Sequence, residues 1–432
     1  MLPSADGKES GIGTGVKLRL HYRKGNPAQK LIWLLIALLF SFGTMTDLLG
    51  MPEAVRYSLD ILWILLLALL LRFAAEAAWQ QLGWAVCWVI SFFLLTAAVK
   101  LVRQGSWLTW LWGVRNNFRG YVLFFAGALF WTRDDREDFW RWIDRLFWLN
   151  TAVSAVQFAL GYRQDFLGGL FGVYSGVNTY TNLFLSLVVS RSVVRFLAGE
   201  ESFFCWASKC AAALTVAAMA ELKFFFGEFL VILGLGVLLS ERTPRKWVLV
   251  AGGGCIVLAG AALLSALFPG WGDWFSLENF WRVATDQRGY TASGDLNRLT
   301  AIPEIDRRFF SGFWEKVFGF GLGNCELSGF SFLTTDFARD YQYLHYHWMS
   351  AAFVYLETGW AGLVFFFGFF ALLFCRAGKG KGDSLSQRIT RILAVVCVMT
   401  GIYNASLRAE PGYLVYIAMS LAFVSGRESD EG

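Results

Sequence analysis

Charged residues are scarce in this 432-residue sequence, since only 16% of positions are Asp, Glu, Lys or Arg, whereas a soluble globular chain carries about 25%. Proline and histidine are also few, with 7 and 3 residues. The hydrophobic fraction is 56%, and the chain contains 41 Phe and 20 Trp. A water-soluble protein of this length could not hide so much apolar surface. The composition therefore disfavours soluble enzymes, nucleic-acid binding and intrinsic disorder.

The seven cysteines include no CxxC spacing, so neither a zinc site nor a redox pair is indicated. Most lie in apolar runs, where cysteine acts as a small hydrophobic residue. A secreted disulfide scaffold is disfavoured as well. We expect the protein to use no metal and no other cofactor.

Long hydrophobic runs dominate the rest of the sequence. Because about 20 apolar residues cross a membrane as a helix, these runs predict an all-α polytopic membrane protein with about twelve transmembrane helices. The predicted spans are 30–50, 57–79, 83–101, 108–132, 139–160, 176–198, 203–221, 223–240, 247–268, 347–375, 389–405 and 411–425.

Lysine and arginine set the predicted orientation, because they concentrate in cytoplasmic loops. With the amino terminus inside, more than half of them fall in cytoplasmic segments. The predicted parts are a cytoplasmic tail (1–29), helices one to nine (30–268), a large extracytoplasmic loop subdomain of short helices (269–346), helices ten to twelve (347–425) and a second cytoplasmic tail (426–432).

Several cations fall on the predicted outer side, against this bias. Short outer segments carry Arg56, Lys100, Arg103, Arg115, Arg119, Arg163, Lys223 and Arg408. Each can snorkel singly to lipid headgroups. As a set, beside or within apolar runs where a charge costs about 2.5–3.5 kcal/mol, they indicate a functional anion site at the outer leaflet.

Two motifs place these cations beside other polar groups. In WGVRNNFRG (112–120), Arg115 and Arg119 share one helix face and repel each other unless an anion or an acid lies between them. In ELKFFFGEF (221–229), Lys223 lies between Glu221 and Glu228 at a tight predicted turn. Lys223 is either a structural ion-pair partner or a cation facing a substrate.

Polar side chains also open the predicted sixth span, in the segment 165–185. Its four glycines permit close backbone approach. Asn178, Tyr180 and Asn182 supply groups that hydrogen-bond a sugar, although the segment is equally consistent with a flexible loop that contacts no ligand.

The end of the long loop contains a glycine-rich turn, FGFGLGN (318–324), which lacks the lysine of a phosphate loop. His345 and His347 follow where the chain re-enters the membrane. A histidine there is either structural or a general base, because its ordinary pKa is near 6.5.

These features together resemble the O-antigen polymerase and O-antigen ligase superfamily of bacterial membrane glycosyltransferases. The resemblance rests on GGLFG with NTYTNLFL, on AELKFFFGEF, on GFGLGN and on HYHWMSAAFVYLETGWAGL. The first two motifs look most like the branch that polymerises capsular or exopolysaccharide repeat units. Ligases of the group place a histidine where this chain has Trp348, with His347 one residue too far upstream of Gly359 and Gly362.

The resemblance implies a GT-C-like enzyme in the bacterial cytoplasmic membrane, working at its outer face. Donor and acceptor would be glycans on undecaprenyl diphosphate, joined by an inverting, metal-independent reaction that polymerises a surface polysaccharide. Further partners would be membrane lipid, a chain-length regulator and a flippase. A ligase, or a flippase or other transporter of lipid-linked oligosaccharide, is the alternative.

The resemblance also implies roles for individual residues. Cations would stabilise the leaving lipid diphosphate, and a base would deprotonate the acceptor hydroxyl. The candidate bases are His347, His345 and Glu221. The candidate diphosphate ligands are Lys223, Arg115, Arg119, Arg298, Arg288 and Arg163.

Overall fold

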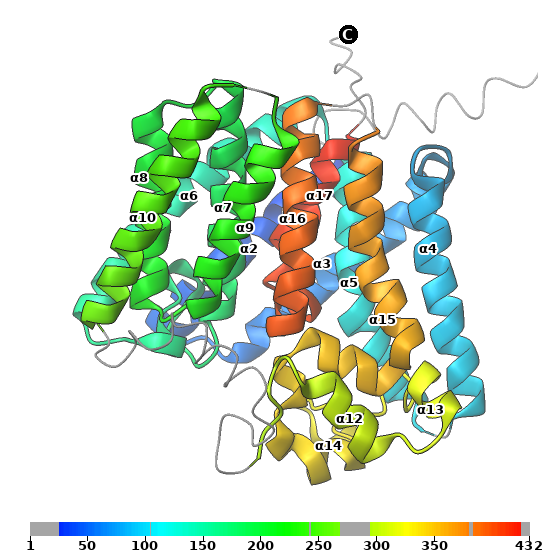
Figure 1. Cartoon of the computed structure of the whole chain (residues 1–432). Coiled ribbons are helices and arrows are strands. Elements are labelled where there is room, and N and C mark those ends of the chain that lie inside the picture. The colour runs from blue at the N-terminus through cyan, green and yellow to red at the C-terminus, as the bar shows by residue number, and fades with distance from the viewer. Residues whose placement is uncertain (1–25, 104, 242, 268–293, 380–382, 425–432) are drawn as a thin grey trace, which may run out of the picture.

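The computed structural model describes residues 26–103, 105–241, 243–267, 294–379 and 383–424. Within these ranges every regular element is helical. Most of the long helices form a bundle, and the short helices α12 (Ala301–Phe309), α13 (Phe313–Phe318) and α14 (Asp336–Tyr341) gather at one end of it (Figure 1). The bundle helices are α2 (Pro27–Gly43), α3 (Ser58–Leu69), α4 (Ala75–Val102), α5 (Trp107–Phe130), α6 (Arg133–Ala159), α7 (Asn178–Ala198), α8 (Phe203–Met219), α9 (Lys223–Leu239), α10 (Arg245–Leu267), α15 (Ser350–Ala377), α16 (Ser384–Tyr403) and α17 (Gly412–Ser420).

Six helical stretches in the described ranges are long and apolar enough to cross a membrane. They are Pro27–Leu48, Glu53–Val102, Asn178–Ala198, Arg245–Leu263, Ser350–Ala377 and Ser384–Tyr403. Phe203–Met219 and Gly412–Phe423 are apolar but shorter. The chain is therefore an all-α protein with the helices of a membrane protein.

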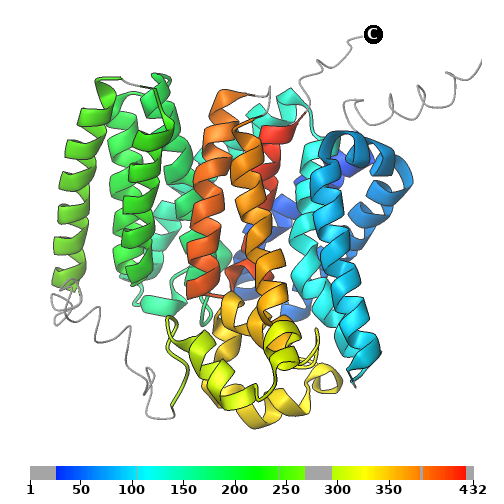
Figure 2. The ribbon, with the colours of Figure 1, turned by 45° about the vertical axis from the view of Figure 1, so that its right-hand side comes forward.

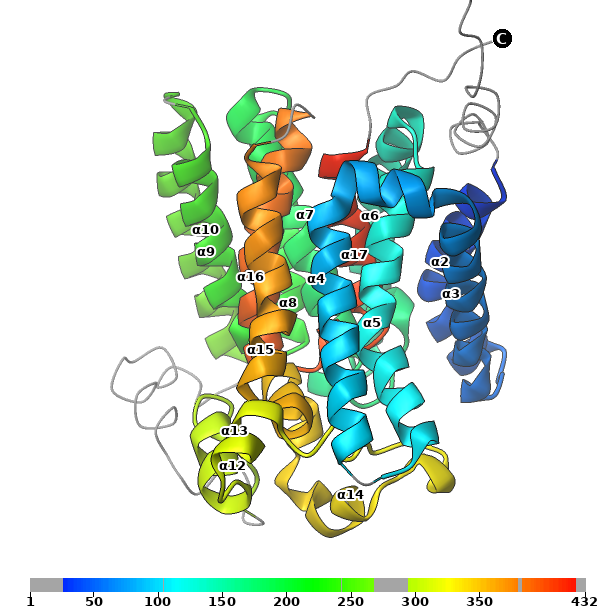
Figure 3. The same ribbon diagram turned by 90° about the vertical axis from the view of Figure 1, so that its right-hand side faces the viewer.

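Two predicted spans, 57–79 and 83–101, belong to one continuous helical stretch, Glu53–Val102. The sequence between them contains good helix formers and neither proline nor glycine before Gly83, so hydrogen bonding continues through it. The direction changes instead at η3 (Leu70–Ala74), a π-helical segment, and at Leu82, whose backbone is not helical. Figure 3 shows the chain crossing the end of the bundle between α3 and the rest of α4.

Sequence signals explain where individual helices begin and end. Asn26 caps α2, because its side chain accepts from the Ala28 N–H at 3.0 Å while Gln29 accepts from the Asn26 N–H at 3.1 Å. Thr132 and Asp135 form the same kind of cap at α6. Gly199, with φ of 88°, ends α7 in the left-handed conformation that glycine adopts without strain.

The interior of the bundle is built around α7, α17 and the second half of α5, nearly all of whose residues are buried. Glycines let α5 and α17 approach closely. A side chain at Gly120 would overlap the Tyr416 ring, and one at Gly127 would overlap the Ser420 hydroxyl. This close packing holds the polar turn of α5, residues 115–119, against the start of α17.

Residues 294–349 form what we call the loop subdomain, at one end of the bundle beneath α15 and α16 (Figure 2). The carboxyl-terminal end of α17 lies at the opposite end of the bundle (Figure 1). The helices of the subdomain are α12 (Ala301–Phe309), α13 (Phe313–Phe318), η7 (Ser331–Leu333), α14 (Asp336–Tyr341), η8 (Gln342–Leu344) and η9 (Tyr346–Trp348). α15 begins at Ser350, three residues after the predicted start of the tenth span.

Candidate functional site

The polar turn of α5 lies at the loop-facing end of the bundle, and its first arginine is held by an acid from α3. Arg115 donates to both carboxylate oxygens of Asp60, at 2.9 and 2.6 Å. This two-bond geometry fixes the guanidinium plane. Arg115 also lies 3.8 Å from Glu410. Asp60 thus pairs with Arg115, one of the two arginines that the motif places on one helix face.

Arg119, one turn further along α5, is almost fully buried. It donates to the Glu410 carboxylate at 2.8 Å and to the Arg408 carbonyl at 2.6 Å. Tyr180 donates to the other Glu410 oxygen at 3.1 Å. Burial raises the pKa of Glu410, but the charges of Arg119 and Arg115 outweigh burial and hold that pKa at about 2. Glu410 is therefore ionised at neutral pH.

Arg408, in η10 (Ser406–Arg408), connects this pair to the loop subdomain. Its guanidinium donates to Glu326 at 3.2 Å and to Asn117 at 3.3 Å. It also lies 3.9 Å from Glu357 and 3.6 Å from the Phe353 ring centre. We refer to Arg115, Arg119, Arg408, Asp60, Glu326, Glu357 and Glu410 together as the ionic cluster.

The glycine-rich turn of the loop subdomain forms one wall of the ionic cluster. Gly323 and Cys325 donate their backbone N–H groups to one Glu357 oxygen, at 3.0 and 3.1 Å. The turn reaches Glu357 because Gly319, with φ of 65°, lies so close to the backbone of α15 that a side chain there would overlap it. Gly359 interrupts α15 at the same place, with φ of 60° and ψ of −158°.

The two histidines lie beside the cluster in the segment that leads into α15. His345 has a left-handed backbone and stacks on Trp348, with ring centres 3.8 Å apart. Burial lowers the pKa of His347 to about 4, and the charges of His345 and Arg408 add to that effect. Its imidazole is therefore neutral at pH 7. The buried Nδ1 of His347 has no hydrogen-bond partner among the described residues.

Lys223, Glu221 and Arg298 form a separate group at the start of α9. The Lys223 ammonium lies 3.4 Å from the Glu221 carboxylate, as the structural interpretation of this motif predicted. Burial raises the pKa of Glu221, and the charge of Lys223 opposes that rise. The Arg298 guanidinium lies 4.1 Å from the ring centre of Tyr403, which in turn stacks on Phe224. Arg298 is close enough to Lys223 to act on it electrostatically.

The three candidate glycan ligands lie in α7 but have different partners. Tyr180 contacts the ionic cluster by donating to Glu410. Asn178 donates to Asp165 at 2.8 Å. Asn182 donates at 2.9 Å to Glu228, a fully buried carboxylate that also accepts from Ser186 and Thr400.

The remaining described candidate cation, Arg163, is not brought into the cluster. Arg163 is exposed, and its guanidinium contacts the carbonyls of Phe158 and Tyr162 and the Phe158 ring. Arg288 lies outside the described residues.

The sequence did not predict a role for Arg408 or for the four acids of the cluster, which are Asp60, Glu326, Glu357 and Glu410. For Glu357, however, the sequence does contain a sign of function. Glu357 lies inside the apolar run of the tenth span, and an acid within a membrane helix marks a functional site by default.

The cluster combines guanidinium groups with carboxylates, and the neutral imidazole of His347 lies beside it. Guanidinium groups can hold a phosphate or a carboxylate, and the carboxylates and the imidazole can accept a proton. No group of three or more His, Cys, Asp or Glu side chains in the described ranges is placed to hold a metal ion.

Comparison with protein-family models gives no match for this sequence, and comparison with curated proteins gives none either. The fold defines an all-α membrane protein.

Proposed function

We propose that the protein is a membrane glycosyltransferase that polymerises undecaprenyl-diphosphate-linked oligosaccharide repeat units into a surface polysaccharide. In this proposal the bundle helices make about twelve crossings of the bacterial cytoplasmic membrane in a GT-C-like arrangement. Both termini are cytoplasmic, and the loop subdomain and the ionic cluster face outside.

The observation that carries the proposal is the position of the ionic cluster. Two buried arginines, Arg119 of α5 and Arg408 of η10, and the partly buried Arg115 of α5 lie where the bundle meets the loop subdomain. A charged side chain within a membrane protein costs free energy. A group of charged residues at one end of the bundle therefore favours a function at that end. A lipid diphosphate presents its charge at the membrane surface, which is the depth expected for this end of the bundle.

The proposed reaction is a single displacement at the anomeric carbon of the donor. The acceptor hydroxyl oxygen forms the new glycosidic bond, and the bond from the anomeric carbon to the diphosphate oxygen breaks with inversion. The hydroxyl proton passes to a base, for which His347 is the first candidate because its imidazole is neutral at pH 7. His345 and Glu221 remain the other candidates.

The arginines would stabilise the diphosphate as negative charge develops on it. Arg115 and Arg119 are already paired with Asp60 and Glu410. An incoming diphosphate would therefore compete with these acids for the guanidinium groups. Lys223 and Arg298 form a second cationic group for the acceptor or for the same diphosphate. Tyr180 is the glycan-binding candidate with the best support, since its hydroxyl lies at the cluster.

Reconstitution of the full chain with a short undecaprenyl-diphosphate-linked repeat unit tests the proposal. Lengthened lipid-linked glycan and released undecaprenyl diphosphate are the expected products. Transfer only to a different acceptor would identify a ligase instead. Movement of the substrate across the membrane without a new glycosidic bond would identify a flippase and overturn the proposal.

A further inference from the structure

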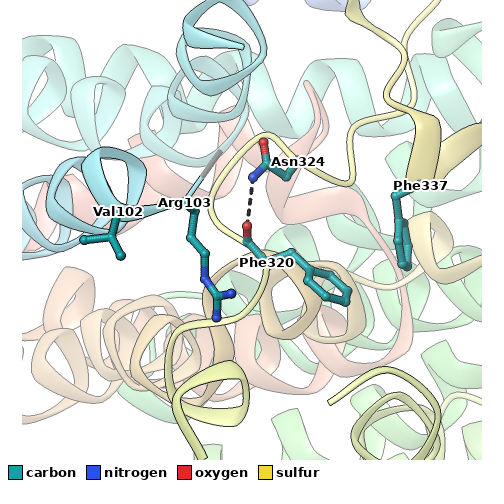
Figure 4. A pocket seen from close by; sticks show the side chains of 5 residues that line it. All are labelled: Val102, Arg103, Phe320, Asn324 and Phe337. Atoms are coloured by element: carbon teal, nitrogen blue, oxygen red, sulfur yellow. Dashed lines mark hydrogen bonds between the residues drawn. The ribbon is translucent and has the colours of Figure 1, made fainter. Parts of the chain in front are cut away.

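A cavity of about 510 Å³ lies at the corner where α4 ends and α5 begins (Figure 4). It is lined by Val102, Arg103, Phe320, Asn324 and Phe337. The glycine-rich turn contributes to both the cavity and the ionic cluster, because Phe320 and Asn324 line the cavity while the Gly323 N–H donates to Glu357. The cavity and the cluster therefore use different residues of one turn.

Arg103 lines the cavity without a partner for its charge. Its guanidinium makes no hydrogen bond or ion pair with any residue in the described part of the chain, whereas Arg115, Arg119 and Arg408 all have carboxylate partners. Arg103 acts electrostatically on Glu315, but that carboxylate caps α13 and accepts hydrogen bonds from the backbone of Ser311 and Gly312.

Lys100 brings to the same corner a second cation that has no carboxylate partner among the described residues, and its ammonium lies 5.6 Å from the Trp107 ring centre. The residue is only 4% exposed, and its ammonium has no hydrogen-bond partner among the described residues. The position of a side chain at Gly105 would be 3.1 Å from the Lys100 Nζ and 2.3 Å from the Asn324 Oδ1. Gly105 therefore lies against both the Lys100 ammonium and the Asn324 side-chain oxygen. Burying an ammonium group without an anion is strongly unfavourable, so the arrangement calls for an anion.

We propose that this corner binds a phosphate ester, and that the ester is the headgroup of an anionic lipid. Guanidinium and ammonium groups are the protein's usual phosphate ligands, and α5 begins here at Trp107 with the positive end of its dipole. Leu101 and Val102 beside the cavity are 75% and 83% exposed, so they offer an apolar surface to acyl chains. The proposal depends on the charges of this corner and not on glycosyl transfer.

Native mass spectrometry of the full chain in detergent tests this site with two lipids of matched acyl chains. Phosphatidylglycerol carries a phosphate and diacylglycerol does not. The protein should retain phosphatidylglycerol in preference, and Arg103→Gln should lower that retention about tenfold. Arg339→Gln is the matched control, because Arg339 is an exposed arginine of the loop subdomain that already pairs with Asp336.

Lys100→Met separates binding from a structural role. Removal of an unpaired buried charge should raise the melting temperature in lipid-free detergent while lowering phosphatidylglycerol retention. A lower melting temperature with unchanged retention would mean that Lys100 only supports the fold, which overturns the proposal. Equal retention of both lipids, or parental retention by Arg103→Gln, would also overturn it.

Excess inorganic phosphate distinguishes the two sources of the phosphate group. Displacement of phosphatidylglycerol by phosphate would support a site that recognises the phosphate alone. Retention that resists phosphate but still depends on Arg103 would support a site in which the acyl chains contribute.

Discussion

Arg119 and Glu410 form an ion pair at 2.8 Å although they are 291 positions apart in the sequence. Their contact joins α5 to the segment that leads into α17, next to the glycine contacts through which these helices pack. The Arg119 guanidinium is further fixed by the Arg408 carbonyl. The pair therefore ties the polar turn of α5 to Arg408, and through Arg408 to the loop subdomain.

Removing one partner of this pair should destabilise the fold. Arg119→Gln leaves the Glu410 carboxylate without its closest cation, and a broken buried pair costs about 3–5 kcal/mol. We expect a clear drop in the melting temperature of the detergent-solubilised protein. Arg133→Gln, which removes an exposed arginine that pairs with the exposed Glu137, should leave the melting temperature almost unchanged. Equal effects of the two variants would contradict the structural role of the pair.

Glu410 should make stability depend on pH in the acid range. Its pKa falls from 4.5 in the unfolded chain to about 2 in the fold, since the arginine charges outweigh burial. The stabilisation is present in full above about pH 4.5 and is lost as the pH falls from there through about 2. The stability difference between the parent and Glu410→Gln should shrink across this window. A difference that stays constant with pH would show that the carboxylate is not held ionised.

His347 should contribute a pH dependence in a higher range. Its pKa is about 4 in the fold and 6.5 ordinarily, so the unfolded chain binds a proton between these values and the folded chain does not. Stability from this group is therefore present above about pH 6.5 and falls as the pH drops towards 4. His347→Gln should flatten the melting-temperature profile in that interval. Parallel profiles for parent and variant would argue against a buried neutral imidazole.

Gly359 should be irreplaceable in α15. Its backbone conformation is accessible almost only to glycine, and a side chain would lie 2.4 Å from the Val317 backbone. Gly359→Ala should cost at least about 1–3 kcal/mol in stability. Gly227→Ala is the matched control, because Gly227 lies in α9 with open space around it. That change should stabilise the helix by about 0.5–1 kcal/mol. Similar melting temperatures for the two variants would rule out the proposed constraint.

The cations proposed to hold the diphosphate should matter for polymer synthesis. Lys223→Ala and Arg115→Ala should each lower the rate of glycan lengthening, by about 100-fold if the lost group stabilises the leaving diphosphate. Arg339→Ala, in the exposed pair with Asp336, should retain the parental rate. Polymer length and yield equal to the parent, at equal protein level, would exclude Lys223 and Arg115 from this role.

Local sequence was sufficient to place most helices. The predicted spans 108–132, 176–198 and 223–240 correspond to Trp107–Phe130, Asn178–Ala198 and Lys223–Leu239. Hydrophobic length is a property of consecutive residues, so it can be counted along the chain. The continuous stretch Glu53–Val102 was not predicted from the sequence. Hydropathy shows where an apolar run becomes less hydrophobic, but it does not show whether the backbone stops being helical there.

The partners of the charges could not be found in the same way. The sequence indicated that Arg115 and Arg119 share a helix face and need an anion between them. Helix packing alone brings Asp60 and Glu410 to that face, and places Glu326 and Glu357 around Arg408. Such contacts join residues that are distant in the chain, and their energies depend on burial and distance, which local composition does not encode. For the same reason, the sequence did not distinguish Lys100 and Arg103 from the other cations on the predicted outer side. Only the fold shows that these two lack carboxylate partners in the described part of the chain.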